Sequence, residues 1–135
     1  MTPKRGSIRR ECRVACSPDA AWRLVGDPAR IAEWWPGIVD ATVDGTARVI
    51  TTGSGIPMPE EIVTVDPLQR RFQYRITAPM FKEHLSTLDV IELGDGTCLL
   101  VYSVDAQPST MALVIGGAAG NALENARRIL EGDQP

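Results

Sequence analysis

Hydrophobic and polar residues alternate over residues 7–16, a pattern typical of a β-strand. The strand is expected to end where Ser17 and a following proline form the usual start of a helix, which we predict over 18–25. An Asp-Pro pair repeats this start signal and predicts a second short helix over 28–33, which a Pro-Gly pair stops. The chain therefore begins with a strand followed by two short helices.

After these helices the pattern changes to a period of two residues. Six extended segments follow, separated by short turns rich in glycine, proline and aspartate. Such short connections require antiparallel neighbours, so most of these strands form one meander. The six segments are 38–45, 46–53, 59–66, 70–77, 83–93 and 97–105.

Residues 109–131 contain no proline and carry apolar residues at helical spacing, which predicts one long amphipathic helix. This helix is the only element long enough to cover the apolar face of a seven-stranded antiparallel sheet, so the sheet must curl around it. A helix about 10 Å wide does not fill a strongly bent sheet along its whole length. The pattern therefore predicts an α+β fold with a gap that is either plugged by side chains or open to a ligand.

The length and charge of the chain limit the classes of function that are expected. The 135 residues are expected to form a single domain over 1–135, with residues 1–6 disordered. The net charge of −3 and the isoelectric point near 5.1 leave no basic surface for nucleic acid. The longest apolar stretch, 111–120, is about half of a bilayer crossing, and the N-terminus lacks the apolar run of a secretory signal. We expect a cytoplasmic protein without nucleic-acid binding or integral membrane association.

The residues that usually bind metals are few and scattered. Cys12, Cys16 and Cys98 fit a reducing compartment and lack the spacing of paired metal-ligand motifs. His84 is the only histidine. The sequence also contains no phosphate-binding loop and no nucleophile elbow, so neither a metal nor another cofactor is expected.

Four phrases, in their serial order, resemble a known family. The chain is similar to the SRPBCC superfamily and, within it, to the bacterial polyketide cyclase/dehydrase and lipid-transport group of START-like proteins. The likeness spans nearly the whole chain, because the phrases follow one another in the family's order. They are CSPDAAWRLVGDPARIAEWWPGI, EEIVTVDPLQRRFQYRIT, HLSTLDVIELGDGTCLLVYS and ALENARRILEGD.

This resemblance implies a helix-grip fold, in which a curved seven-stranded antiparallel sheet wraps around a long C-terminal helix and two short helices lie between strands one and two. It also implies an elongated apolar cavity between sheet and helix. Members of the family bind lipids, sterols, polyketides or plant hormones, and only some of them are enzymes.

Strand alternation identifies side chains that would face such a cavity. In residues 71–76 the apolar Phe72, Tyr74 and Ile76 alternate with polar residues, so these three are expected to point inward. For the strand over 97–105 both faces are nearly equally apolar, and the pattern does not choose between them.

Polar residues are expected on the same inner face. The apolar register of their strand carries His84 and Ser86 inward. In the expected strand over 59–66, an inward Val63 would place Glu61 on the inner face as well, because the two residues lie two positions apart. Ile62 favours the opposite register. A buried carboxylate or imidazole needs a partner, so each of these groups is expected either to bond within the wall or to meet water and ligand.

If the protein is an enzyme, the catalytic candidates are His84, Glu61 and Tyr74, with Ser86 as an alternative to Tyr74. His84 or Glu61 would remove an α-proton from a β-keto chain, because an imidazole or a carboxylate in an apolar pocket is suited to proton transfer. Tyr74, or alternatively Ser86, would polarise a carbonyl.

Large apolar residues occur where a loop or helix end is expected. Trp34 and Trp35 are adjacent at the end of the second short helix, so their rings point about 100° apart and only one of them enters the core directly. Met80 and Phe81 occupy a turn, where they would form a pocket rim, offer a partner surface or fold back over the sheet. The full set of ligand-binding candidates is Trp34, Trp35, Glu61, Val63, Phe72, Tyr74, Ile76, Met80, Phe81, His84, Ser86, Met111, Ile115 and Ala119.

Three functions remain open. The first is binding of a small hydrophobic molecule, such as a lipid, sterol or polyketide, in the cavity between the sheet and the C-terminal helix. The second is a metal-free polyketide cyclase, aromatase or dehydratase. The third is a protein-interaction module of the co-chaperone type, for which the interior should be plugged by side chains. In each case we expect a monomer or a homodimer.

Overall fold

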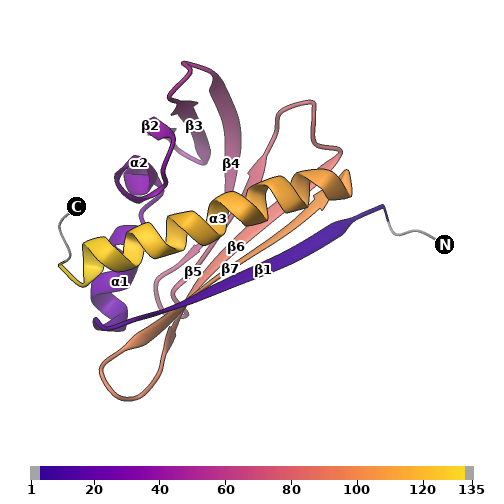
Figure 1. Ribbon diagram of the computed structural model, residues 1–135. Coiled ribbons are helices and arrows are strands. Elements are labelled where there is room, and N and C mark those ends of the chain that lie inside the picture. The colour runs from indigo at the N-terminus through magenta and orange to yellow at the C-terminus, as the bar shows by residue number, and fades with distance from the viewer. Residues whose placement is uncertain (1–3, 133–135) are drawn as a thin grey trace.

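The computed structural model describes residues 4–132 and contains a curved antiparallel sheet that wraps around one long helix (Figure 1). The strands lie in the order β1-β7-β6-β5-β4-β3-β2, so that only β1 departs from the meander. The predicted helix-grip fold is confirmed. The strands are β1 (Gly6–Val14), β2 (Ile38–Asp44), β3 (Ala47–Thr52), β4 (Pro57–Asp66), β5 (Arg71–Ile76), β6 (Glu83–Glu92) and β7 (Cys98–Gln107).

Two short helical segments connect β1 to β2. Helix α1 (Pro18–Val25) begins at Ser17, whose side chain accepts a hydrogen bond from the Ala20 amide at 3.1 Å. The second segment is a 3₁₀ turn, η1 (Pro28–Arg30), that leads into the single turn of α2 (Ile31–Trp34). Both start signals in the sequence therefore operate as predicted.

Helix α3 (Ser109–Leu130) lies across the concave face and packs mainly on β1 and β7 (Figure 1). Small residues allow α3 to pack closely against these strands. A Cβ added at Gly116 would lie 2.5 Å from Cγ2 of Ile8, and Ala112 and Ala119 are completely buried. Because α3 lies close to the β1 edge, the β2–β4 part of the concave face is left less covered.

The inward register agrees with the alternation in most strands. Phe72, Tyr74, His84 and Ser86 are all buried. In β7 the residues on the inner face, left open by the pattern, are those completely or almost completely buried: Cys98, Leu100, Tyr102, Val104 and Ala106.

In β4 the predicted register of Glu61 and Val63 is wrong. A bulge lies between Ile62 and Thr64, so that Val63 is an extra residue without a partner in β5. Beyond the bulge Val65 pairs with the buried Phe72, but before it the phase reverses and Glu60 takes the inner face. Glu61 therefore lies on the outside, where it forms an ion pair with Arg75 at 2.9 Å, and Val63 is 39% exposed.

The first strand begins closer to the N-terminus than the sequence predicts. The expectation of disorder over 1–6 is wrong for Gly6, which is the first residue of β1, and Arg5 forms an ion pair with Glu83 at 2.6 Å. Residues 1–3 lie outside the described part of the chain. Within residues 4–132, none of the helices combines the length and apolar character needed to cross a membrane.

Candidate functional site

A cavity of about 280 Å³ lies between the concave face of β2–β5, the α2–β2 turn and helix α3. Its wall is mostly apolar, and the polar side chains in it are Glu60, Tyr74 and Thr52. Prominent apolar lining residues are Trp35, Ile38, Ile50, Met58, Ile76 and Ile115. The gap that the bent sheet predicts is therefore open.

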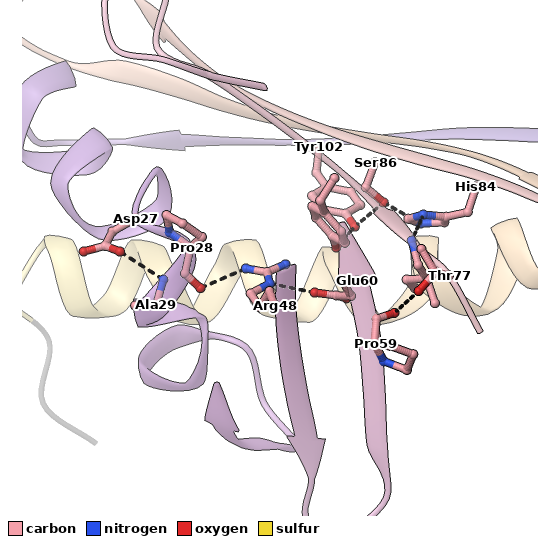
Figure 2. Close-up of polar contacts among 12 residues, drawn as sticks. Asp27, Pro28, Ala29, Arg48, Pro59, Glu60, Thr77, His84, Ser86 and Tyr102 are labelled. Carbon is pink, nitrogen blue, oxygen red and sulfur yellow. Dashed lines mark hydrogen bonds and ion pairs between the residues drawn. The ribbon is translucent and has the colours of Figure 1, made fainter. Parts of the chain in front are cut away.

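Glu60 belongs to a buried ion pair. It lies directly opposite Arg48 across β3 and β4, and Arg48 Nε donates to Glu60 Oε1 at 2.6 Å (Figure 2). The two side chains are only 0% and 2% exposed. Because a buried charge without a counter-charge is costly, each member keeps the other in the interior.

Other groups hold Arg48 in position. Its Nη1 donates to the Pro28 carbonyl at 3.0 Å (Figure 2), and its guanidinium lies 4.7 Å from the ring centroid of Tyr74 and 5.3 Å from that of Phe72. Both aromatic faces attract the cation. Arg48 is thus fixed from three sides, while its Nη2 is buried without a hydrogen-bond partner among the described residues.

The second carboxylate oxygen of Glu60, Oε2, differs from Oε1 in its hydrogen bonding. None of the described residues donates a hydrogen bond to Oε2, and Glu60 lines the cavity whereas Arg48 does not. Burial raises the pKa of Glu60, and the Arg48 charge opposes this rise. The residue therefore offers a free carboxylate oxygen in the wall of a mostly apolar cavity.

A second polar cluster connects β5, β6 and β7. The Tyr74 and Tyr102 hydroxyls lie 2.6 Å apart, Tyr102 donates to Ser86 Oγ at 2.7 Å, and Ser86 Oγ lies 2.9 Å from His84 Nε2. The Ile76 amide donates to His84 Nδ1 at 2.8 Å. We call these four side chains the hydroxyl network; Figure 2 shows the part that joins Tyr102, Ser86 and His84.

Two contacts fix the direction of the network, the one that His84 accepts at Nδ1 and the one that Tyr102 donates to Ser86. A neutral imidazole that accepts at Nδ1 carries its proton on Nε2, so His84 donates to Ser86. Tyr102 uses its only proton toward Ser86, and Tyr74 must therefore donate to Tyr102. Burial lowers the pKa of His84 to about 4 and raises the pKa of Tyr74 to about 12, so all four groups are neutral at pH 7.

Among the sequence candidates, the structure places Trp35, Tyr74, Ile76 and Ile115 in the cavity wall. The adjacent tryptophans divide as the helix geometry requires. Trp34 is 2% exposed within the core, and Trp35 contacts the edge of Tyr102 with 5.4 Å between ring centroids.

The other candidates lie outside the lining. Phe72 packs beneath Arg48, and His84 and Ser86 are bonded within the hydroxyl network. Phe81 packs edge-on against His84 at 5.2 Å, whereas Met80 is 53% exposed. Trp34, Met111 and Ala119 belong to the core or its margin, and Glu61 and Val63 are on the outer face.

Sequence reasoning missed the two charged residues of the site. The signal for Glu60 was present, because Ile62 two positions later favours the register that the structure adopts. Arg48 precedes Val49 and Ile50, so alternation alone does not identify its face. Within residues 4–132, no three His, Cys, Asp or Glu side chains are grouped in a way that could hold a metal.

The curled sheet, the gripped helix and the cavity between them define a START-like protein of the helix-grip class. The chain belongs to the polyketide cyclase / dehydrase and lipid transport family, whose sequence profile matches residues 5–132. This confirms the resemblance found in the sequence. None of the functionally curated proteins matches the chain in sequence.

Solved structures with the same fold come from bacteria and a plant. The XoxI protein of Bacillus cereus is 20% identical, with a TM-score of 0.86 over 93% of this chain and 95% of that one. A protein from Thermobifida fusca is 24% identical, with a TM-score of 0.78 over 95% of each chain. Norcoclaurine synthase from Thalictrum flavum, in complex with dopamine and hydroxybenzaldehyde, is 16% identical, with a TM-score of 0.74 over 97% of this chain and 89% of that one. At these identities the likeness establishes the fold.

Proposed function

We propose that this protein binds a small, mostly apolar molecule in the cavity between the sheet and α3. The observation that carries the proposal is the open cavity of about 280 Å³, which has a mostly apolar wall that contains one buried carboxylate. Ligand sites in proteins combine these features, and this volume is at the small end of their range of roughly 300–1,000 Å³. A compact aromatic or short-chain ligand therefore fits better than a whole lipid.

The family supports the same conclusion. Its description covers polyketide cyclases, dehydrases and lipid transport, all of which handle apolar molecules. The norcoclaurine synthase structure, which has the same fold, contains two small aromatic compounds. An interaction module, by contrast, was expected to have a plugged interior.

A second candidate is an acid–base enzyme of the cyclase or dehydratase type. It is favoured by the Glu60 carboxylate, which faces the cavity beside Tyr74 and has a raised pKa, as a general base requires. Glu60 takes this role in place of Glu61, which lies outside, and of His84, whose two ring nitrogens already have protein partners. In an enzyme, the double variant Arg48→Met with Glu60→Gln, which removes both charges together, would abolish turnover of a ligand that still binds; in a binding protein the variant would change affinity alone.

Ligand binding is tested with two variants of the same helix. Ile115 lines the cavity, whereas Leu113, two residues earlier, is 62% exposed and does not. The purified protein is first analysed by native mass spectrometry for a co-purified molecule. Thermal shifts are then measured with naphthalene, 2-naphthol and decanoic acid.

We expect at least one of these compounds to stabilise the wild type and Leu113→Phe equally. Ile115→Phe should lose the stabilisation, because the larger ring fills the cavity. The proposal is contradicted if no compound shifts the wild type and no molecule co-purifies, or if Ile115→Phe responds like the wild type.

A further inference from the structure

We infer that Glu60 selects the polar group of the ligand: the cavity accepts an apolar molecule that donates a hydrogen bond, such as a phenol, alcohol or amine, and rejects carboxylates and molecules with acceptors only. This inference rests on the proposed function and adds the class of ligand. It follows from the protonation and the existing partners of the groups that line the cavity.

The first step concerns the charge of Glu60. Its Oε1 accepts from Arg48 at 2.6 Å, and both side chains are excluded from solvent. An arginine does not deprotonate, so a neutral Glu60 would leave a buried positive charge without a counter-charge. Glu60 is therefore ionised, and an ionised carboxylate only accepts hydrogen bonds.

The second step concerns Oε2. No described residue donates to this oxygen, and Glu60 is a lining residue, so the missing partner must come from the cavity. A buried acceptor left without a donor costs about 1–3 kcal/mol. A ligand that displaces water from this position must therefore bring a donor of its own.

The third step concerns Tyr74, the other buried polar residue in the cavity wall. Its proton is used toward Tyr102, because Tyr102 donates its own proton to Ser86 and can only accept from Tyr74. Tyr74 therefore has no proton to offer a ligand. Glu60 and Tyr74, which belong to separate clusters, therefore both lack a proton that could be donated to a ligand.

The remaining donors on the wall are neutral and lie in other elements. Thr52 ends β3, where its hydroxyl bonds Ser54 at 2.9 Å, and Trp35 follows α2. Neither carries a positive charge that could pair with a ligand carboxylate, and Arg48, already paired with Glu60, is not itself a lining residue. A ligand carboxylate would therefore be buried without a counter-charge of its own and would bring only acceptors to an oxygen that needs a donor, which opposes binding.

Three naphthalenes with the same ring system and different polar groups test this selection. 2-Naphthol donates a hydrogen bond, 2-methoxynaphthalene only accepts one, and 2-naphthoate is an anion. Calorimetric titration of the wild type at pH 7 should give at least tenfold tighter binding for 2-naphthol than for 2-methoxynaphthalene, and no detectable binding of 2-naphthoate. A site built to bond a donor group discriminates strongly against analogues that lack it.

Variants at the charged pair identify the residue responsible. The double variant Arg48→Met with Glu60→Gln removes both charges together, so it avoids a buried unpaired arginine. Its amide offers a donor as well as an acceptor, and the preference for 2-naphthol over 2-methoxynaphthalene should fall to less than threefold. Glu61→Gln, on the outer face one residue away, is the control and should keep the wild-type ranking.

The outcomes separate this inference from the proposed function. If naphthalene compounds bind the wild type but 2-methoxynaphthalene matches 2-naphthol, or 2-naphthoate binds most tightly, the inference is wrong while ligand binding stands. If the ranking is unchanged in the double variant, Glu60 is not the selecting residue. If none of the compounds binds and none co-purifies, the proposed function fails and the inference with it.

Discussion

The two halves of the concave face differ although one sheet and one helix form both. Toward β1 and β7 the helix lies so close that Gly116 leaves no room for a Cβ beside Ile8. Toward β2–β4 a cavity of about 280 Å³ remains. A helix that packs tightly on one edge of a curved sheet is held away from the other edge, so Ala112, Gly116 and Ala119 help to create a cavity that they do not line.

The polar groups of the two halves differ in the same way. The hydroxyl network of β5–β7 is neutral and each member bonds to the next. The Arg48–Glu60 pair of β3 and β4 is charged, and both side chains keep one polar atom without a described partner. Complete networks stabilise and specify a core, whereas an incomplete buried group points to a ligand.

The largest expected effect is on the charged pair. Glu60→Ala leaves Arg48 buried and unpaired, so the free energy of unfolding should fall by about 3–5 kcal/mol in urea denaturation. Glu61→Ala is the matched control: its ion pair with Arg75 is half exposed, and its loss should cost about 1 kcal/mol or less. Equal losses from the two neighbours would contradict the assigned register.

The next effect is the pH dependence of His84. Its pKa is about 4 in the folded protein and 6.5 when unfolded, so between these values only the unfolded chain binds the proton. Stability should therefore decrease as the pH falls from 6.5 to 4, by about 3 kcal/mol at 1.36 kcal/mol for each pH unit, and this contribution is constant above 6.5.

The variant His84→Gln isolates this contribution from the carboxylates that titrate in the same range. Its stability, measured by urea denaturation at several pH values, should depend less on pH than that of the wild type between pH 4 and 6.5. A parallel pair of curves would show that the imidazole is not buried in its neutral form.

A smaller effect is expected within the hydroxyl network. Tyr102→Phe removes the acceptor of Tyr74 and the donor to Ser86, which should lower the free energy of unfolding by about 1–3 kcal/mol. Tyr74→Phe removes only the terminal member and leaves the Tyr102 bond to Ser86 intact, so it should cost less. If Tyr74→Phe were the more destabilising of the two, the hydroxyl protons of the network would point in the opposite direction, toward the cavity.

The smallest effects concern two neighbouring glycines of α3. Each Gly→Ala change gains about 1 kcal/mol of helix propensity. At Gly117 the added Cβ meets open space, so Gly117→Ala should raise the free energy of unfolding by about this amount. At Gly116 the Cβ would overlap Ile8, and Gly116→Ala should instead be destabilising by about 1 kcal/mol in thermal or urea unfolding. Two changes of the same sign would show that α3 does not lie closely on β1.

The sequence predicts the fold well because its signals are local. Ser17 and Asp27 cap the short helices as expected, and the alternation of Phe72, Tyr74 and Ile76 places Tyr74 on the inner face. A gap between the helix and the sheet follows from the ratio of one helix to seven strands, although this ratio does not decide whether side chains fill it. These features depend on spacing along the chain and little on distant contacts.

The site is predicted less well because its charged residues depend on long-range pairing. Beyond the bulge only Val65 follows the predicted register, because it pairs with the buried Phe72; Val63 is the bulged residue itself, and the phase before it is reversed for Glu61. Nothing local marks Arg48 as buried; its place depends on a carboxylate twelve residues later and a carbonyl in η1. Which tryptophan lines the cavity is likewise decided by how α2 meets the sheet.

The two consecutive glutamates of β4 have a consequence for folding errors. A shift of one residue in the pairing of β4 with β3 would put Glu61 opposite Arg48, so the arginine would still find a counter-charge. Electrostatics therefore penalises this misaligned hairpin very little. The correct alignment must instead be selected by apolar side chains such as Met58 and Ile62. The same slip would move these side chains from the inner face of the sheet to the solvent-exposed face.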